Sequence, residues 1–196
     1  MATEIELKAH VKDSDALKGL LGEKADYLYV FEKEDNYFFP SGFSAHFPSG
    51  VRIRSEKRTF PDGQIKTLCF VTYKVKEVRS GIEINDEREF EISTSSGHPS
   101  AEFREFLIKL ELKPGISKGK RGWAFSHEGI TAELVEVGRL GWFLELEVIN
   151  NEKEREDTFT KEKERLLSFL DDLGIEREAI ESRYYSEMLV PKSPVN

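Results

Sequence analysis

Charged and large apolar side chains alternate in the first stretch of the sequence that could do chemistry, Glu4-Ile5-Glu6-Leu7-Lys8. A strand sends successive side chains to opposite faces, so Glu4, Glu6 and Lys8 would share one face and Ile5 and Leu7 the other. Carboxylates suit hard divalent cations, and an ammonium group suits phosphate oxygens. Such a face could bind a metal and an anion, although an antiparallel sheet with its charged face in water shows the same pattern.

The same alternation returns in later segments. Within each of these segments, the charged residues of the polar face all have the same sign. These polar faces consist of Arg52 and Arg54; Thr72, Lys74 and Lys76; Glu83, Glu87, Glu89 and Glu91; Lys118 and Lys120; and Glu145 and Glu147. If the apolar faces pack outward against helices, the polar faces meet inside a closed or nearly closed barrel. Such an interior would need water, metal ions and a polyanion, because desolvating an unpaired charge costs several kcal/mol.

The elements that must position these residues are runs of strands interrupted by helices. Alternation predicts strands at about 4–8, 27–39, 51–54, 66–76, 82–92, 123–125, 130–137 and 142–149. Hairpin turns between neighbouring strands indicate a mostly antiparallel sheet in an α+β fold. The first helix is expected to begin at a cap formed by Asp13 or Ser14. The second is expected to begin at Ser100 and to end at Pro114-Gly115. The third is expected to begin at Thr158 or Thr160 and to end at Gly174. The second helix should bury Phe103, Phe106, Leu107 and Leu110.

Composition limits the class of protein. The 196 residues fit a single domain at 1–190 with a disordered tail at 191–196, and the net charge of −8 argues against a large nucleic-acid interface. A single cysteine, Cys69, in an apolar strand pattern indicates a buried, inert thiol in a reducing compartment. No apolar run approaches the roughly 20 residues of a membrane span, and the N-terminus does not resemble a signal peptide. We expect a cytoplasmic protein without a membrane partner.

Taken in order, the charged segments resemble the CYTH superfamily, the triphosphate tunnel metalloenzymes. This superfamily includes class IV adenylyl cyclases, thiamine triphosphatases and inorganic tripolyphosphatases. Glu4 to Lys8 resembles its ExExK signature, and the later motifs are matched by Asp35-Asn36-Tyr37-Phe38, Val51 to Arg54, Thr72-Tyr73-Lys74, Leu140 to Glu147 and Tyr184 to Leu189. The resemblance covers nearly the whole chain. It implies an eight-stranded antiparallel β-barrel, the triphosphate tunnel, flanked by helices.

Carried over position by position, the resemblance also implies a ligand set. The cofactor would be Mg²⁺ or Mn²⁺, and the small-molecule partner a triphosphate such as ATP, tripolyphosphate or thiamine triphosphate; a homodimer is left open. The metal ligands would be Glu4, Glu6, Glu87, Glu89, Glu145 and Glu147, with Glu4, Glu6 and Glu147 as catalytic residues. The phosphate contacts would be Lys8, Arg52, Arg54, Lys74, Lys118 and Lys120, with Arg121 as a replacement for one of the last two.

Three positions depart from the family pattern. Val135 stands where the family often has Asp, and Glu133 on the same face is the candidate to replace that carboxylate. Arg88 would lie on the opposite face of its strand from Glu87 and Glu89, whereas the family carries an Arg on the same face as its glutamates. Phe39 replaces an Asp that often follows the second-strand motif.

The resemblance leaves more than one function open. Hydrolysis of the terminal phosphoanhydride needs only the charged interior and is the function we predict. A class IV adenylyl cyclase, which forms cyclic AMP and pyrophosphate from ATP, would also need a base-binding pocket at one tunnel mouth, and no motif identifies one. A non-catalytic polyphosphate- or nucleotide-binding module and a purely structural β-domain are the remaining alternatives.

Overall fold

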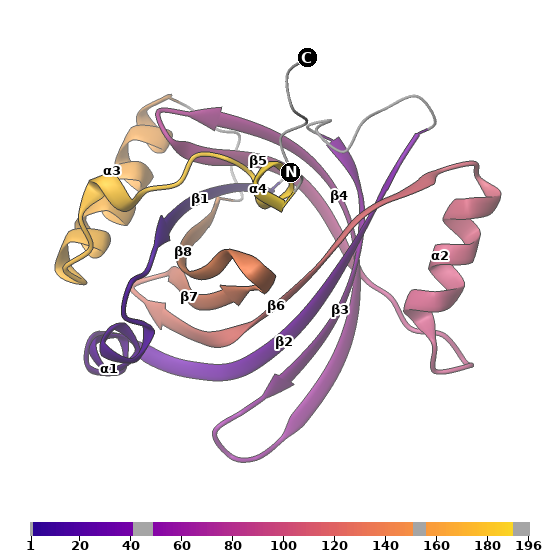
Figure 1. The fold of residues 1–196 in the computed structure, drawn as a ribbon, viewed down its shortest axis with the longest axis horizontal. Coiled ribbons are helices and arrows are strands. Elements are labelled where there is room, and N and C mark those ends of the chain that lie inside the picture. Colours follow the sequence, from indigo (N-terminus) through magenta and orange to yellow (C-terminus); the bar gives the residue numbers. More distant parts are fainter. Residues whose placement is uncertain (1, 41–48, 151–155, 190–196) are drawn as a thin grey trace.

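The computed structural model describes residues 2–40, 49–150 and 156–189, and its strands close into an antiparallel barrel (Figure 1). The order around the barrel is β1-β5-β4-β3-β2-β6-β7-β8. The strands are β1 (Ala2–His10), β2 (Asp26–Phe39), β3 (Ser49–Thr59), β4 (Ile65–Arg79), β5 (Ile82–Glu91), β6 (Lys113–His127), β7 (Ile130–Val137) and β8 (Gly141–Asn150). The predicted eight-stranded antiparallel barrel is confirmed.

Tight turns set the register of two hairpins. Ser80 and Gly81 join β4 to β5, and Glu128 and Gly129 join β6 to β7, all four with positive φ. Two consecutive residues of positive φ match the twist of the flanking strands, which favours short antiparallel connections. These turns fix which side chains face inward.

The structure describes four helices, three on the outside of the barrel and a last, short one that reaches its interior. They are α1 (Ser14–Lys24), α2 (Pro99–Lys109), α3 (Glu156–Asp172) and α4 (Tyr185–Leu189), with short 3₁₀ turns η1 (Gly138–Leu140) and η2 (Arg177–Ala179). Helices α1 and α3 lie on the β1 side of the barrel, and α2 lies on the opposite side (Figure 1). Within the described ranges, no helix has both the length and the apolar character of a membrane span.

The main core lies between the barrel wall and helices α1 and α3. Ile5 and Leu7 of β1 are fully buried there, against residues such as Leu21 of α1 and Leu166 of α3. The apolar faces of the strands therefore point outward to the helices, as the alternation predicts, and the charged faces point inward.

Several predicted helix boundaries are wrong. Asp13 does cap α1, accepting a bond from the backbone N–H of Ala16, but α2 starts at Pro99 after His98 rather than at a Ser100 cap. Helix α2 ends at Lys109, and Glu111 follows with positive φ. Pro114-Gly115 belongs to β6, which is much longer than expected. Helix α3 already includes Thr158 and Thr160, so neither is its cap.

Helix α2 buries a narrower stripe than its pattern indicates. Leu107 is buried against Phe38, Ile53 and Cys69, whereas Phe106 and Leu110 are more than half exposed. Phe106 packs against Phe103 of the same helix, with the ring centres 5.5 Å apart. Cys69 is buried there as predicted, and burial raises the pKa of its thiol. The predicted tail at 191–196 lies outside the described residues.

Candidate active site

A cavity of about 610 Å³ occupies the inside of the barrel. We call this cavity the tunnel. All eight strands contribute to its lining, which includes Glu4 and Glu6 (β1), Lys33 (β2), Arg52 and Arg54 (β3), Lys74 (β4), Glu87 (β5), Lys118 and Lys120 (β6), Glu133 (β7), and Glu145 and Glu147 (β8). Charged residues far apart in the sequence therefore converge on one space, because the inward face of each strand repeats every second residue.

Carboxylates concentrate on the β1–β8 side of the tunnel. Glu6 stands directly opposite Glu147 in the antiparallel register. Burial, followed by the charges of Glu83, Glu145 and Glu4, raises the pKa of Glu6 to about 7. Burial and the neighbouring Glu4 and Glu6 also raise the pKa of Glu147 well above its ordinary value. This side therefore carries more negative charge than its neighbours neutralise.

One ammonium group partly balances the acidic side. Lys74 Nζ lies 2.6 Å from a carboxylate oxygen of Glu4 and 3.2 Å from one of Glu87, and 3.9 Å from one of Glu6. Although burial acts in the other direction, these carboxylates hold the pKa of Lys74 well above its ordinary value. Lys74 therefore stays charged at the centre of the acidic side.

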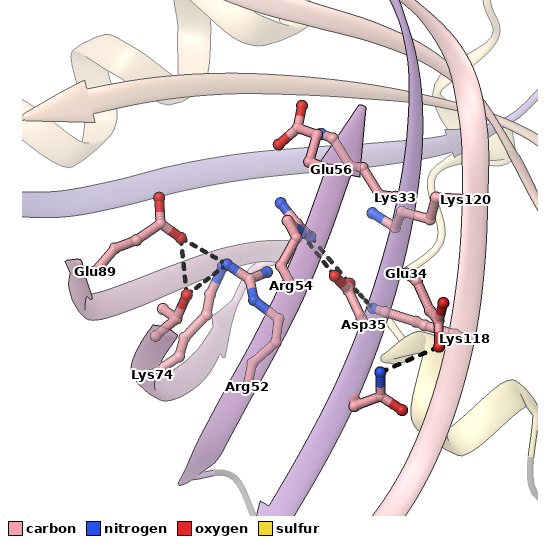
Figure 2. A network of polar contacts seen from close by, with 12 residues as sticks. Lys33, Glu34, Asp35, Arg52, Arg54, Glu56, Lys74, Glu89, Lys118 and Lys120 are labelled. Atoms are coloured by element: carbon pink, nitrogen blue, oxygen red, sulfur yellow. Dashed lines mark hydrogen bonds and ion pairs between the residues drawn. The ribbon is translucent and has the colours of Figure 1, made fainter. Parts of the chain in front are cut away.

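Guanidinium groups project from β3, which lies across the barrel from β1 and β8, and Figure 2 shows Arg52 and Arg54 there. Arg54 donates two hydrogen bonds to Asp35, of 2.6 and 3.0 Å, and Asp35 is fully buried. Burial would raise the pKa of Asp35, but Arg54 holds it well below its ordinary value. Arg52 donates to Thr72 at 2.9 Å and to Glu89 at 2.9 Å. The two arginines are thus oriented by carboxylates of β2 and β5.

Three lysines extend the basic wall, Lys8 adds a fourth ammonium group from β1, and each lies near a carboxylate. The pairs are Lys8 with Glu83 (2.7 Å), Lys33 with Glu133 (2.5 Å), Lys120 with Glu145 (2.7 Å) and Lys118 with Asp35 (3.8 Å). Figure 2 shows Lys33, Lys118 and Lys120 reaching from β2 and β6 toward the same space as Arg52 and Arg54. An anion with several charged oxygens could replace these carboxylates as the partner of the basic groups.

Most of the predicted site residues line the tunnel, with two exceptions. Lys8 lies buried in the wall, with its ammonium group on Glu83. Arg121 is misassigned: its side chain is 73% exposed on the outer face, where it pairs with Glu136. In β6 it has the opposite parity to Lys118 and Lys120, so it cannot take the place of either inside the barrel.

Comparison with known proteins identifies the family. The family model of the CYTH domain matches residues 2–185. The chain belongs to the CYTH family. It is 28% identical to the putative adenylate cyclase MJ0240 of Methanocaldococcus jannaschii over 194 residues, which cover 94% of this chain and 97% of that protein.

Solved structures share the fold of this CYTH chain. PH1819 from Pyrococcus horikoshii matches with a TM-score of 0.78 and 26% identity, over 95% of this chain and 97% of the other. A putative adenylyl cyclase from Hippeastrum, HpAC1, for which a dominant triphosphatase activity is described, matches with a TM-score of 0.65 and 18% identity, over 97% and 98% of the two chains. At that identity the second likeness concerns the fold alone.

Several tunnel residues of this CYTH protein were given no role from the sequence. They are Tyr29 and Lys33 of β2, Glu56 and Arg58 of β3, and Tyr185 of α4. Both faces of β2 are polar, since Glu32 and Glu34 are exposed on the outside while Lys33 and Asp35 are buried inside. The alternation of charged and apolar residues therefore does not indicate which face of β2 points into the barrel. Tyr185 comes from a short segment whose position depends on tertiary contacts.

The three departures from the CYTH pattern have structural explanations. Val135 is buried in an apolar cluster with Phe31 and Phe143, and Glu133 lines the tunnel in contact with Lys33. Arg88 is exposed yet belongs to the tunnel lining. Phe39 is buried with its ring between the backbones of β3 and β6, where Gly50 and Gly115 leave room that a Cβ atom would fill.

The chemistry of the acidic side fits the divalent cation that the CYTH resemblance implies. Its donors are carboxylate oxygens, which Mg²⁺ and Mn²⁺ prefer, and burial, followed by the charges of neighbouring glutamates, raises the pKa values of Glu6 and Glu147. Among the described residues, no group of three or more His, Cys, Asp or Glu side chains is already arranged as a metal site. Lys74 lies among these carboxylates instead, so metal binding would require small side-chain movements.

Proposed function

We propose that this CYTH protein is a divalent-metal-dependent triphosphatase, which binds an inorganic or organic triphosphate in the tunnel and hydrolyses its terminal phosphoanhydride. One observation carries the proposal: a carboxylate wall around Glu6 and Glu147 faces a wall of guanidinium and ammonium groups across a single cavity. A metal-bound polyphosphate has this complementary distribution of charge. Neither wall would be stable as a dry interface.

The basic wall binds and orients the phosphates in this proposal. Arg52 and Arg54 present planar groups that can take two phosphate oxygens each, while Lys118 and Lys120 act as point charges. Lys74 contributes a further point charge from the acidic side. Lys8 and Lys33 add charge from the wall. These residues are held in place by carboxylates, so little side-chain freedom is lost when phosphate oxygens replace those partners.

The acidic wall would supply the reaction chemistry. Glu4, Glu6 and Glu147, with Glu87, Glu89 and Glu145 nearby, would hold Mg²⁺ or Mn²⁺, which neutralises phosphate charge and polarises phosphate oxygens. Glu6 lines the tunnel within this wall, where its carboxylate would hold the attacking water and accept its proton. Water oxygen bonds to the terminal phosphorus, the bridging P–O bond breaks in line, and the shortened polyphosphate leaves.

A second candidate is the adenylyl cyclase reaction, favoured by an aromatic group in the tunnel wall. The Arg58 guanidinium lies 4.7 Å from the ring centre of Tyr29 and 5.9 Å from that of Phe70, and all three residues line the cavity. Such a group could stack on a nucleobase. The 3′ hydroxyl of ATP would then attack the α-phosphorus and release pyrophosphate. MJ0240, named a putative adenylate cyclase, is a relative at 28% identity.

Product analysis distinguishes the two reactions. The protein is incubated with ATP or tripolyphosphate and Mg²⁺ or Mn²⁺, and the products are resolved by ³¹P NMR. We expect orthophosphate with ADP from ATP, and orthophosphate with pyrophosphate from tripolyphosphate. Cyclic AMP with pyrophosphate would replace the triphosphatase proposal by the cyclase. Binding of the triphosphate without turnover would indicate a non-catalytic binding module and would contradict both proposed reactions.

An outer-face variant provides a control for the basic wall. Arg52→Ala should raise the KM for tripolyphosphate by about tenfold or more, because it removes a charge-assisted contact to phosphate. Arg121→Ala should leave KM unchanged, because that side chain lies outside the barrel. Equal effects of the two substitutions would contradict binding inside the tunnel.

A further inference from the structure

Tyr185, the first residue of α4, brings three lysine ammonium groups to one aromatic ring. The Nζ atoms of Lys8, Lys118 and Lys120 lie 4.7, 5.0 and 4.9 Å from the ring centre. These distances are within the roughly 6 Å reach of a cation–π interaction. The ring is 5% exposed, so these contacts are largely shielded from water, which strengthens them.

Carboxylate partners are also present for all three lysines. They come from three different strands, β5, β8 and β2. The pairs are Lys8 with Glu83, Lys120 with Glu145 and Lys118 with Asp35. Each ion pair draws its ammonium group toward a different strand, and the three like charges repel one another. The Tyr185 ring is a contact that all three share.

The position of the ring is set by the segment before α4. Ile180 bridges to Ala9 of β1, and the Glu181 backbone N–H donates a 2.8 Å hydrogen bond to the Lys8 carbonyl oxygen. The Phe143 ring then packs edge-on against Tyr185, with the ring centres 5.1 Å apart. The ring is therefore anchored by β1 and β8 and does not depend on the lysines for its place.

The phenol stays neutral beside these charges. Burial, followed by the adjacent Glu145 carboxylate, raises the pKa of Tyr185 well above its ordinary value. The three ammonium groups therefore meet the face of an uncharged ring, and a phenylalanine ring would offer them a similar face.

We propose that Tyr185 is a positioning residue whose ring holds the ammonium groups of Lys118 and Lys120, which line the tunnel, as a preformed binding pair for one phosphate group, while the buried Lys8 adds its charge from the wall. The proposal rests on the proposed function, because the phosphate is one of those of the triphosphate. Phosphate oxygens take over from the carboxylate partners of Lys118 and Lys120, while the ring continues to hold the three cations in place. Tyr185 acts through the lysines and does not itself take part in the reaction.

Ring substitutions test this role in the full chain. Tyr185→Leu should raise the KM for tripolyphosphate by about tenfold or more with a much smaller change in kcat, because it removes the shared cation–π contacts. Tyr185→Phe keeps the ring and should stay within about twofold of wild type. Tyr27→Leu is the matched control, since Tyr27 is 40% exposed and its ring packs against Phe125 of the outer core. A Tyr185→Phe protein as impaired as Tyr185→Leu, or an unchanged KM in Tyr185→Leu, would overturn the proposal.

A second readout does not depend on catalysis. In protein with ¹³C-labelled lysine, the ring current of Tyr185 should shift the ε-CH₂ signals of Lys8, Lys118 and Lys120 upfield, and Tyr185→Leu should abolish these shifts while Tyr185→Phe keeps them. The same spectra show whether each variant is folded. Missing shifts in wild type would overturn the Tyr185 proposal whatever the protein binds. Wild-type protein that shows the shifts but does not bind tripolyphosphate would instead overturn the proposed function.

Discussion

Raising the pH of the metal-free protein should destabilise it, because Glu6 must lose its proton inside the tunnel. The pKa of Glu6 is about 7 in the folded protein and 4.5 in the unfolded chain. Between these values the folded protein holds a proton that the unfolded chain lacks. The free energy of unfolding therefore falls as the pH rises through this window and levels off above it. Below 4.5, both states are protonated and the effect vanishes.

The size of the effect follows from the same two values. The interval from 4.5 to about 7, at about 1.36 kcal/mol per unit, corresponds to a loss of about 3 kcal/mol. The Glu6 side chain is only 12% exposed, so solvent screens this loss little. Glu147 adds to it in the same direction, since its pKa is also raised.

Urea unfolding in the presence of a chelator measures this loss. Wild type should lose about 3 kcal/mol or more between about pH 5 and pH 8, and Glu6→Gln should lose less because its side chain does not titrate. Glu32→Gln, at an exposed position on the outer face of β2, should behave like wild type. Adding Mg²⁺ or Mn²⁺ at about pH 8 should restore stability by binding the ionised carboxylates. Stability that is constant or rising over this range, or a Glu6→Gln slope equal to that of wild type, would refute the reasoning.

Two further substitutions test how the site is held. Arg54→Ala should cost about 3–5 kcal/mol of unfolding free energy, because it leaves the buried Asp35 carboxylate without its bidentate partner. Adding Asp35→Asn to this variant should recover much of that loss. If urea unfolding shows that the losses of the two single variants simply add, the pairing is contradicted. Gly122→Ala should lower the melting temperature strongly, because its Cβ would clash with the carbonyl oxygen of Leu134 in β7. Gly119→Ala on the same strand has open space and should be tolerated, so equal melting temperatures would be inconsistent with the close β6–β7 approach.

The sequence predicts the barrel and much of the tunnel because most strands have one charged and one apolar face. In β1, β3 and β8 this contrast assigns Glu6, Arg54 and Glu147 to the interior directly. In β2 the contrast fails, since the exposed Glu32 and the buried Lys33 are both charged and adjacent. Only the barrel register, which pairs β2 with both β3 and β6, shows which of them faces inward.

Contacts between distant segments are beyond what alternation can predict. The Lys33–Glu133 pair joins residues that are 100 positions apart, and Tyr185 reaches the tunnel only because η2 and the following residues attach to β1. The apolar pattern of α2 likewise indicates four buried residues, but Phe106 and Leu110 are more than half exposed in the folded protein. Periodicity identifies faces of elements, whereas the contacts across the tunnel depend on closure of the barrel.

The rate of orthophosphate release from tripolyphosphate, measured side by side for wild type and Glu147→Gln with saturating Mn²⁺, tests the central claim most directly. Wild type should release orthophosphate and pyrophosphate in equal amounts. Glu147→Gln, which keeps the size of the side chain but removes a carboxylate from the acidic wall, should lose at least about a hundredfold in kcat. Equal rates for the two proteins, or no release by wild type, would contradict hydrolysis of a triphosphate inside the tunnel.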